Sequence, residues 1–369
     1  MKKAAVVMLF LAGVTFVAGG SGRLDSVGNF VADVQAKSET ESEEEPEEAD
    51  ESERKDRVVQ IDTSVPIEAG SWIAVVSKAV DGEFWKLVRH GMEDAVEDIN
   101  KAYEFSSNDE LTMTFEGASD EEDIETQVNT LDAVIAENPT AVCLSAGDIA
   151  SCQAQLEAAM ENGIPTVVFD SNVNEDELVS AFRGTDNVYV GQLAGKKLAE
   201  AIGESGKVAI FSAQEKTESS QKRVEGFKTA MTEYPDIAIV RTIYSDKVED
   251  MSAVMTDVLT RYPDLDGVFC SNGDVADLYL EIEKEENQPI MIGVDATTAQ
   301  QEAIKAGTEF GAVSQDPYEM GYQTILTAVQ AMSSDEETAE AVAKNILLEP
   351  KWIDVSNIEA PESANYLYQ

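Results

Sequence analysis

The chain has 369 residues, and its 72 acidic residues outnumber 26 basic ones, which gives a formal net charge of −46. Hydrophobic residues make up 43% of it, enough for one or two buried cores, so the chain is neither disordered throughout nor fibrous. Such an excess of acid argues against nucleic acid as a partner and against charge-driven binding to an anionic membrane.

Histidine and cysteine are scarce, and this narrows the possible chemistry. His90 is the single histidine, so a multi-His metal site is impossible, and we expect this residue at the surface of a helix or at its cap. Cys143 and Cys270 lie in apolar runs typical of buried strands. Three cysteines cannot form a closed disulfide framework, although a bridge between Cys143 and Cys152 remains possible.

Residues 1–22 predict a signal peptide or a membrane anchor. Lys2 and Lys3 precede an apolar run over residues 4–20, and small residues follow it. The run is marginal for a bilayer span, which needs about 20 apolar residues, so both cleavage and retention remain possible. Either outcome places the rest of the chain outside the cytoplasm.

Residues 23–70 are expected to form an acidic, disordered tether. Within them, residues 39–56 hold eleven acidic and two basic residues and show no apolar periodicity. Like charges repel, and little apolar surface is available for burial. The tether would act as a spacer or, alternatively, as an acidic interaction segment.

From Trp72 onward, apolar strand-like runs alternate with amphipathic helical runs. Strands are predicted at 72–77, 111–117, 141–144, 166–170, 207–211, 237–244, 267–271, 290–294 and 310–314. Helices are predicted at 84–100, 124–135, 150–162, 219–234, 247–262, 274–286, 298–306 and 317–333. This alternation predicts an α/β fold with parallel sheets, and the number of strands favours two Rossmann-like lobes.

Several predicted strands end in polar residues: Ser77, Asp170, Asn272, Asp295 and Gln315. In open α/β sheets a ligand binds beyond the carboxyl ends of the strands. These side chains could therefore converge on one crevice. The alternative is that some of them cap the helices that follow or form turns.

The order of short motifs resembles that of ribose-binding-protein-like sugar receptors, the type I periplasmic binding proteins. The motifs lie at 73–85, 162–170, 184–195, 223–227, 267–272, 292–295 and 311–317. The resemblance covers about residues 72–355. It implies two lobes joined by a three-crossing hinge, with a sugar bound between them.

The resemblance also implies where each lobe begins and ends. The N-terminal lobe would comprise residues 71–185 with 316–344. The C-terminal lobe would comprise residues 186–315 with 345–357. Closure of the hinge would trap the ligand.

Several residues fall on the binding positions of these receptors. Phe84 and Trp85 lie where the family stacks aromatic rings on the sugar, although they could also be ordinary core residues. Asp170 falls on a carboxylate that accepts hydrogen bonds from hydroxyl groups. The matching ligand positions on the other side are Asn272, Asp295 and Gln315.

The two arginines that hold ribose in this family are missing. Ser171 stands in place of one and Gln221 in place of the other, with Arg223 two residues further on. We therefore do not expect ribose itself to be the ligand.

On the opposite wall, Lys78 stands where the ribose receptor has a small hydroxyl group, and Asp81 precedes a glycine that replaces an amide. Lys78 could pair with Asp81 or Asp170. It could instead meet an anionic or heavily hydroxylated ligand, or extend into solvent.

The resemblance implies a monomeric, extracytoplasmic receptor that delivers a sugar or polyol to the permease of an ABC transporter, without a cofactor. A sensor that docks on a chemoreceptor or kinase ectodomain would use the same cleft. A repressor would need a basic helix-turn-helix before Trp72, where an acidic segment stands instead. No Walker, dinucleotide-binding or nucleophile-elbow motif indicates an enzyme.

Overall fold

A computed structural model describes residues 60–282 and 288–369, all of which belong to one compact unit. The predicted signal segment 1–22 and residues 23–59 of the predicted tether lie outside the described residues. In the described part, no helix combines the length and apolar character that a membrane span requires.

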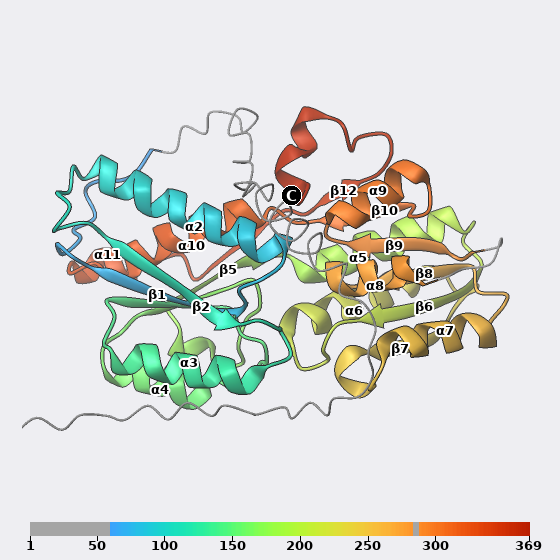
Figure 1. Cartoon of the computed structure of the whole chain (residues 1–369), viewed down its shortest axis with the longest axis horizontal. Helices are drawn as coiled ribbons and strands as arrows, with labels where there is room; N and C mark the ends of the chain where they lie inside the picture. Colours follow the sequence, from blue (N-terminus) through green and yellow to red (C-terminus); the bar gives the residue numbers. More distant parts are fainter. Residues whose placement is uncertain (1–59, 283–287) are drawn as a thin grey trace, which may run out of the picture. The chain divides into compact units, whose positions relative to one another are not determined.

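Two six-stranded sheets organise this unit (Figure 1). The first sheet has the order β11-β5-β4-β3-β1-β2, and all of its strand pairs are parallel. Its strands are β1 (Trp72–Ala79), β2 (Thr112–Ala118), β3 (Ala141–Leu144), β4 (Thr166–Phe169), β5 (Ala181–Thr185) and β11 (Asn345–Leu348). The predicted alternation of strands and helices is confirmed here.

The second sheet has the order β12-β10-β9-β8-β6-β7, and it is parallel except where β12 pairs with β10. Its strands are β6 (Gly206–Ser212), β7 (Ile237–Tyr244), β8 (Gly267–Cys270), β9 (Ile290–Val294), β10 (Gly311–Ser314) and β12 (Lys351–Ile353). The central strands are buried on both faces, which explains why they appear in the sequence as continuous apolar runs.

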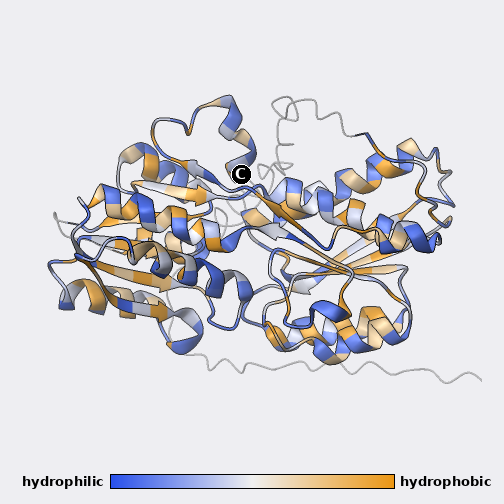
Figure 2. Ribbon diagram, turned by 180° about the vertical axis from the view of Figure 1, so that it is seen from behind, coloured by the Kyte–Doolittle hydropathy of each residue, from blue (hydrophilic) through white to orange (hydrophobic). Residues whose placement is uncertain are grey.

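Helices cover both faces of the first sheet, and their apolar sides turn toward it (Figure 2). On one face lie α2 (Glu83–Ala102) and α10 (Pro317–Ala331); on the other lie α3 (Ile124–Ala136) and α4 (Gln153–Glu161). The short helices η2 (Asp176–Leu178) and α11 (Glu336–Glu340) complete this lobe.

The second sheet is covered in the same way. One face carries α5 (Asn187–Ala201) and α6 (Glu218–Met231), and the other carries α7 (Met251–Arg261), α8 (Gly273–Glu281) and α9 (Thr298–Ala306). The 3₁₀ helices η3 (Ser245–Lys247) and η4 (Pro361–Tyr366) lie in its connections.

In each lobe, one helix pair packs backbone against backbone. A Cβ atom at Gly91 of α2 would lie 2.0 Å from the carbonyl oxygen of Tyr318 in α10, and one at Gly321 would lie 2.0 Å from that of Val88. In the second lobe, a Cβ atom at Gly226 of α6 would lie 2.1 Å from the carbonyl oxygen of α5 residue Val188. Glycine at these positions therefore permits the close approach of the helices.

The chain passes between the sheets three times: from β5 to α5, from β10 to α10, and from β11 to β12. This confirms the fold class, two Rossmann-like lobes joined by a three-crossing hinge. The three cysteines are buried and none of them forms a disulfide bond, so a bridge between Cys143 and Cys152 does not form.

Two expected segment boundaries differ in the structure. Residues 345–348 form β11 and pair with β5 of the first sheet, whereas residues 345–357 were expected in the second lobe. The third crossing follows β11, and a short apolar run does not reveal which sheet edge it joins. Residues 60–70, assigned to the tether, include Ile61, Val65 and Ile67, whose side chains pack against the core of the first lobe.

Candidate functional site

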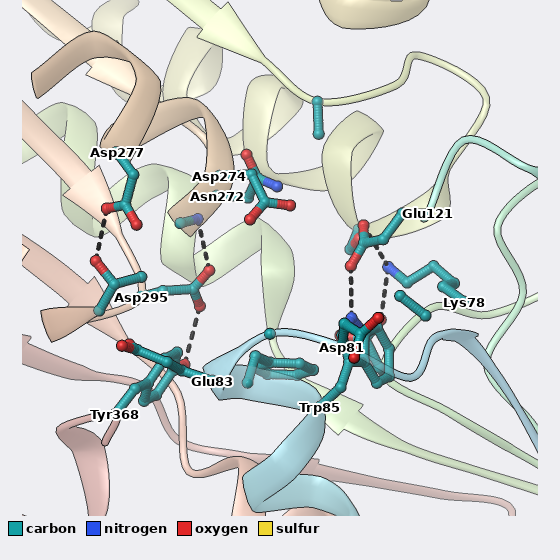
Figure 3. Close-up of a pocket in the computed structure, with 18 of the residues that line it drawn as sticks. Lys78, Asp81, Glu83, Trp85, Glu121, Asn272, Asp274, Asp277, Asp295 and Tyr368 are labelled. Carbon is teal, nitrogen blue, oxygen red and sulfur yellow. Dashed lines mark hydrogen bonds and ion pairs between the residues drawn. The ribbon is translucent and has the colours of Figure 1, made fainter. Parts of the chain in front are cut away.

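A cavity of about 520 Å³ lies between the two lobes, where strands of both sheets end (Figure 3). Most of the residues expected to bind a ligand line it: Lys78, Asp81, Phe84, Trp85, Asp170, Arg223, Asn272, Asp295 and Gln315. Ser171 and Gln221 do not. In open α/β sheets, ligands bind beyond the carboxyl ends of the strands. Residues at the strand ends of both lobes accordingly line one cavity.

Asp170 and Asp295 occupy equivalent places in the two lobes. Asp170 directly follows β4 and has a φ of 57°, while Asp295 directly follows β9 and has a φ of 79°. Each backbone N–H still donates to the neighbouring strand, to the carbonyl groups of Arg183 and Val313 respectively. A left-handed backbone is uncommon outside glycine, and strained backbone of this kind concentrates at functional sites.

Lys78 forms a buried ion pair with Asp170. Its Nζ atom lies 2.8 Å from Asp170 Oδ2 and 3.9 Å from Glu121 Oε2, and it donates to Ser171 Oγ at 3.0 Å. Burial alone would lower the pKa of Lys78, but the two carboxylates outweigh it and the pKa is raised. Burial likewise opposes the charge of Asp170, yet Lys78 lowers its pKa. Both groups therefore stay charged, and Lys78 pairs with Asp170 rather than Asp81 or solvent.

Ser171 lies beneath the cavity wall instead of in it. Its hydroxyl group donates to Asp170 Oδ2 at 3.0 Å, and its Oγ lies within hydrogen-bond distance, 2.9 Å, of Ser219 Oγ in the other lobe. A second contact between the lobes is made by Glu83, whose Oε2 accepts from the backbone N–H of Thr298 at 2.9 Å. The lobes are therefore in contact in this structure.

The two aromatic residues differ in their surroundings. The Trp85 side chain is 3% exposed, belongs to the first core, and donates from Nε1 to Glu121 Oε1 at 2.8 Å. Phe84 is half-buried and meets the Trp85 ring edge-on, with centroids 4.9 Å apart. Trp85 is thus both a core residue and a lining residue, and Phe84 is the more accessible of the two rings.

Asp295 is the centre of a hydrogen-bond network on the second wall. Its Oδ2 accepts from the backbone N–H of Gly273 at 2.8 Å, and its Oδ1 accepts from Gln315 Nε2 at 2.8 Å and from the Tyr368 hydroxyl at 2.9 Å. Asn272 caps α8 by accepting from the Val275 N–H at 3.2 Å, so it combines the capping and lining roles left open by the sequence.

Arg223 is buried on α6. It donates from Nε to Asn187 Oδ1 at 2.8 Å and from Nη1 to the carbonyl oxygen of Ser271 at 2.9 Å. Gln221 is exposed and donates to the carbonyl oxygen of Glu215, away from the cavity. Its expected role is not supported, because two residues along a helix turn a side chain to a different face. Ser219 and Ser220 line the cavity from this helix instead.

Sequence reasoning missed several acidic lining residues: Glu83, Asp120, Glu121, Asp274 and Asp277. Asp274 and Asp277 could have been predicted from the sequence, since they follow the strand-end residue Asn272 within the first turns of the next helix. Burial, followed by neighbouring carboxylates, raises the pKa of Asp274 to about 7. Burial also raises that of Asp277 to about 6, although Thr297 Oγ1 donates to it at 2.6 Å.

Tyr368 was also missed. It comes from the segment after β12, is 1% exposed, and lies with its ring centroid 6.0 Å from that of Phe84. Its backbone N–H donates to the carbonyl oxygen of Ala296, and Gln301 Nε2 donates to its carbonyl oxygen at 2.7 Å. Burial raises the pKa of Tyr368 well above its ordinary value, so the hydroxyl group remains a donor to Asp295.

Replacing Tyr368 with Phe is expected to lower the free energy of unfolding of the ligand-free protein by about 1–2 kcal/mol, because Asp295 loses a charge-assisted hydrogen bond in a buried site. Urea denaturation would measure the loss. Tyr189→Phe, at a 45% exposed tyrosine on α5, serves as the control and should change stability little. Equal stability of both variants would contradict a structural role for the Tyr368 hydroxyl.

In the described ranges, no group of three or more histidine, cysteine, aspartate or glutamate side chains is arranged to hold a metal ion. The fold and cavity instead define a two-lobed binding protein, with acceptors, aromatic rings and buried charges at the ends of both sheets. A family model described as a periplasmic binding protein domain matches residues 73–336, and the chain belongs to this family.

Curated relatives bind sugars according to their names. The chain is 25% identical over 188 residues to the ribose import binding protein of Escherichia coli (strain K12), an alignment that covers 50% of this chain but less than two thirds (63%) of that protein. It is 22% identical over 298 residues to the D-allose-binding periplasmic protein of the same organism, covering 78% of this chain and 91% of that protein.

Solved structures of sugar-bound proteins match a larger part of the chain than the ribose-binding relative does. An ABC transporter solute-binding protein from Agrobacterium vitis, bound with α-D-tagatopyranose, superposes with a TM-score of 0.73 at 26% identity, covering 81% of this chain and 99% of that one. Another from the same organism, with bound D-fucose, has a TM-score of 0.73 at 29% identity and covers 81% of this chain and all of that one.

Proposed function

We propose that this protein is an extracytoplasmic solute-binding receptor that captures a sugar or polyol between its lobes and delivers it to an ABC-type permease. The main support for the proposal is the position of two aspartates, Asp170 and Asp295. They come from different lobes and lie on either side of a cavity that also contains the Phe84 ring. Carboxylates accept hydrogen bonds from hydroxyl groups, and an aromatic face suits the C–H face of a sugar ring.

The mechanism would be a shift between open and closed lobes. A ligand that touches both walls binds the closed state more tightly and increases its population by that difference in affinity. The contacts of Ser171 with Ser219 and of Glu83 with Thr298 would form only on closure. The closed form would then be the form that a permease recognises.

Several further features belong to the same proposal. We infer a monomer that acts by binding and release, without a catalytic step and without a cofactor. The acidic segment before the folded unit would hold the receptor at the outer face of the cytoplasmic membrane or accompany it after secretion.

A thermal-shift screen of the full chain against neutral monosaccharides and polyols tests the proposal. At a ligand concentration of about 100 times Kd, binding adds about 2.7 kcal/mol to the free energy of unfolding, so at least one compound should raise Tm clearly. Phe84→Ala should weaken the affinity for that compound at least tenfold. Met160→Ala, at an exposed site on α4, is the matched control and should bind normally. The absence of stabilisation by any compound would contradict sugar binding.

A further inference from the structure

The charges around the cavity are strongly unbalanced. Eight acidic residues line it: Asp81, Glu83, Asp120, Glu121, Asp170, Asp274, Asp277 and Asp295. Lys78 and Arg223 are the two basic residues that line it in the described part of the chain. A ligand that enters the cavity therefore meets a negative electrostatic environment.

The two bases do not balance the eight acids. Lys78 is engaged by Asp170 at 2.8 Å and lies near Glu121. The Nε and Nη1 atoms of Arg223 donate to Asn187 and to the carbonyl oxygen of Ser271, both of which are uncharged acceptors. The charge of Arg223 alone remains to offset the seven lining acids other than Asp170, so an anionic ligand beside Lys78 is disfavoured.

Two of the lining acids, Asp274 and Asp277, lie on α8. No lysine or arginine within residues 60–282 and 288–369 forms an ion pair with Asp274 or Asp277. Figure 3 shows Asp274 beside Asn272 on the second wall. Burial and the nearby carboxylates of Glu121 and Asp295 raise the pKa of Asp274, so these acids repel one another across the cavity.

Gln315 supplies an independent indication of what the ligand must provide. Its side chain is 2% exposed and lines the cavity, and its Nε2 is used by Asp295. Its Oε1 has no donor among the described residues. A buried acceptor without a donor is costly, and a ligand donor placed there would satisfy it.

We propose that the ligand is a polyhydroxylated molecule that carries a positive charge, an amino sugar, with its ammonium group beside Asp274 and a hydroxyl or ammonium hydrogen donated to Gln315. This inference rests on the proposed function and narrows it. Its basis is an acceptor-rich cavity with unpaired carboxylates, in which the ligand supplies both the hydrogen-bond donors and the compensating charge.

The test compares matched sugars that differ in charge. Calorimetry on the full chain, at about pH 7 and low salt, would measure Kd for each hexose (glucose, galactose and mannose), its 2-amino form, and its uronate. In at least one series, the amino form should bind at least tenfold more tightly than the neutral sugar, and the uronate most weakly. Asp274→Asn should reduce the ratio of amino to neutral affinity at least fivefold. Asp257→Asn removes the same charge from the exposed face of α7 and should keep the ratio.

The outcomes separate the two proposals. If neutral sugars bind as tightly as their amino forms, or if a uronate binds most tightly, the inference about charge is overturned while the proposed function stands. An unchanged ratio in Asp274→Asn also overturns it. If no sugar of any charge binds, the proposed function itself fails.

Discussion

Replacing Lys78 with Met is expected to lower the free energy of unfolding of the ligand-free protein by about 3–5 kcal/mol, because the Asp170 carboxylate would remain buried without its partner. The Lys78 and Asp170 side chains are 5% and 4% exposed, so water compensates little. The expected fall in Tm is on the order of 10 °C. Urea denaturation and calorimetric melting would measure it.

A second variant tests whether the loss of stability in Lys78→Met comes from the broken ion pair. Combining Lys78→Met with Asp170→Asn removes the unpaired charge and should recover part of the stability. Lys196→Met is the matched control, since its 63% exposed side chain forms a surface ion pair with Glu200 and should cost less than about 1 kcal/mol. Equal losses in the single and double variants would contradict the ion-pair explanation.

The same pair predicts a pH dependence. Asp170 has a lowered pKa in the folded protein, so its contribution to stability is complete above the ordinary value of 3.8 and is lost as the pH falls below it. Lys78 has a raised pKa, so its contribution is complete below 10.5 and is lost as the pH rises through the higher folded value. The difference in stability between wild type and Lys78→Met should therefore persist across neutral pH.

Replacing Asp295 with Ala is expected to weaken ligand binding by about tenfold to a hundredfold and also to lower the stability of the ligand-free protein. A hydrogen bond to a charged group contributes about 1.5–3 kcal/mol, which accounts for the loss of affinity. The loss of stability arises because Gly273, Gln315 and Tyr368 all donate to this carboxylate.

Calorimetry with a sugar identified by the thermal-shift screen would measure the affinity, and melting without ligand would measure the stability. Asp295→Asn preserves the size of the side chain but turns an N–H₂ group toward donors, so it should also bind weakly. Asp257→Asn is the control for the change in net charge. Unchanged affinity in Asp295→Ala would remove this residue from the binding site.

The sequence predicted the strands and helices best where their apolar pattern and their ends are clearly marked. Strand β9 and helix α9 begin and end at the predicted residues, 290–294 and 298–306, because apolar runs and a capping box mark them. Strand β5 was missed because Arg183 interrupts its apolar run. That arginine is nevertheless buried, donating to Thr327 Oγ1 at 2.7 Å and to the carbonyl oxygen of Phe182.

The site was predicted to the extent that strand order determines it. Asp170 and Asp295 follow buried strands, so their positions could be inferred from chain topology. Tyr368 could not be inferred, because it reaches Asp295 through a 3₁₀ segment whose path depends on tertiary packing. The predicted role of Gln221 is not supported, because the rotation of α6 about its axis, relative to the sheet, decides which residues of this helix line the cavity.

The reciprocal glycines of the helix pairs limit how the lobes can move. Because α2 touches α10 at Gly91 and Gly321, sliding one helix along the other would bring the carbonyl oxygens of Tyr318 and Val88 against residues that carry a Cβ atom. The same holds for α5 and α6 around Gly226. Shear inside a lobe is therefore blocked, and rotation has to be absorbed by the backbone torsions of the three interlobe crossings.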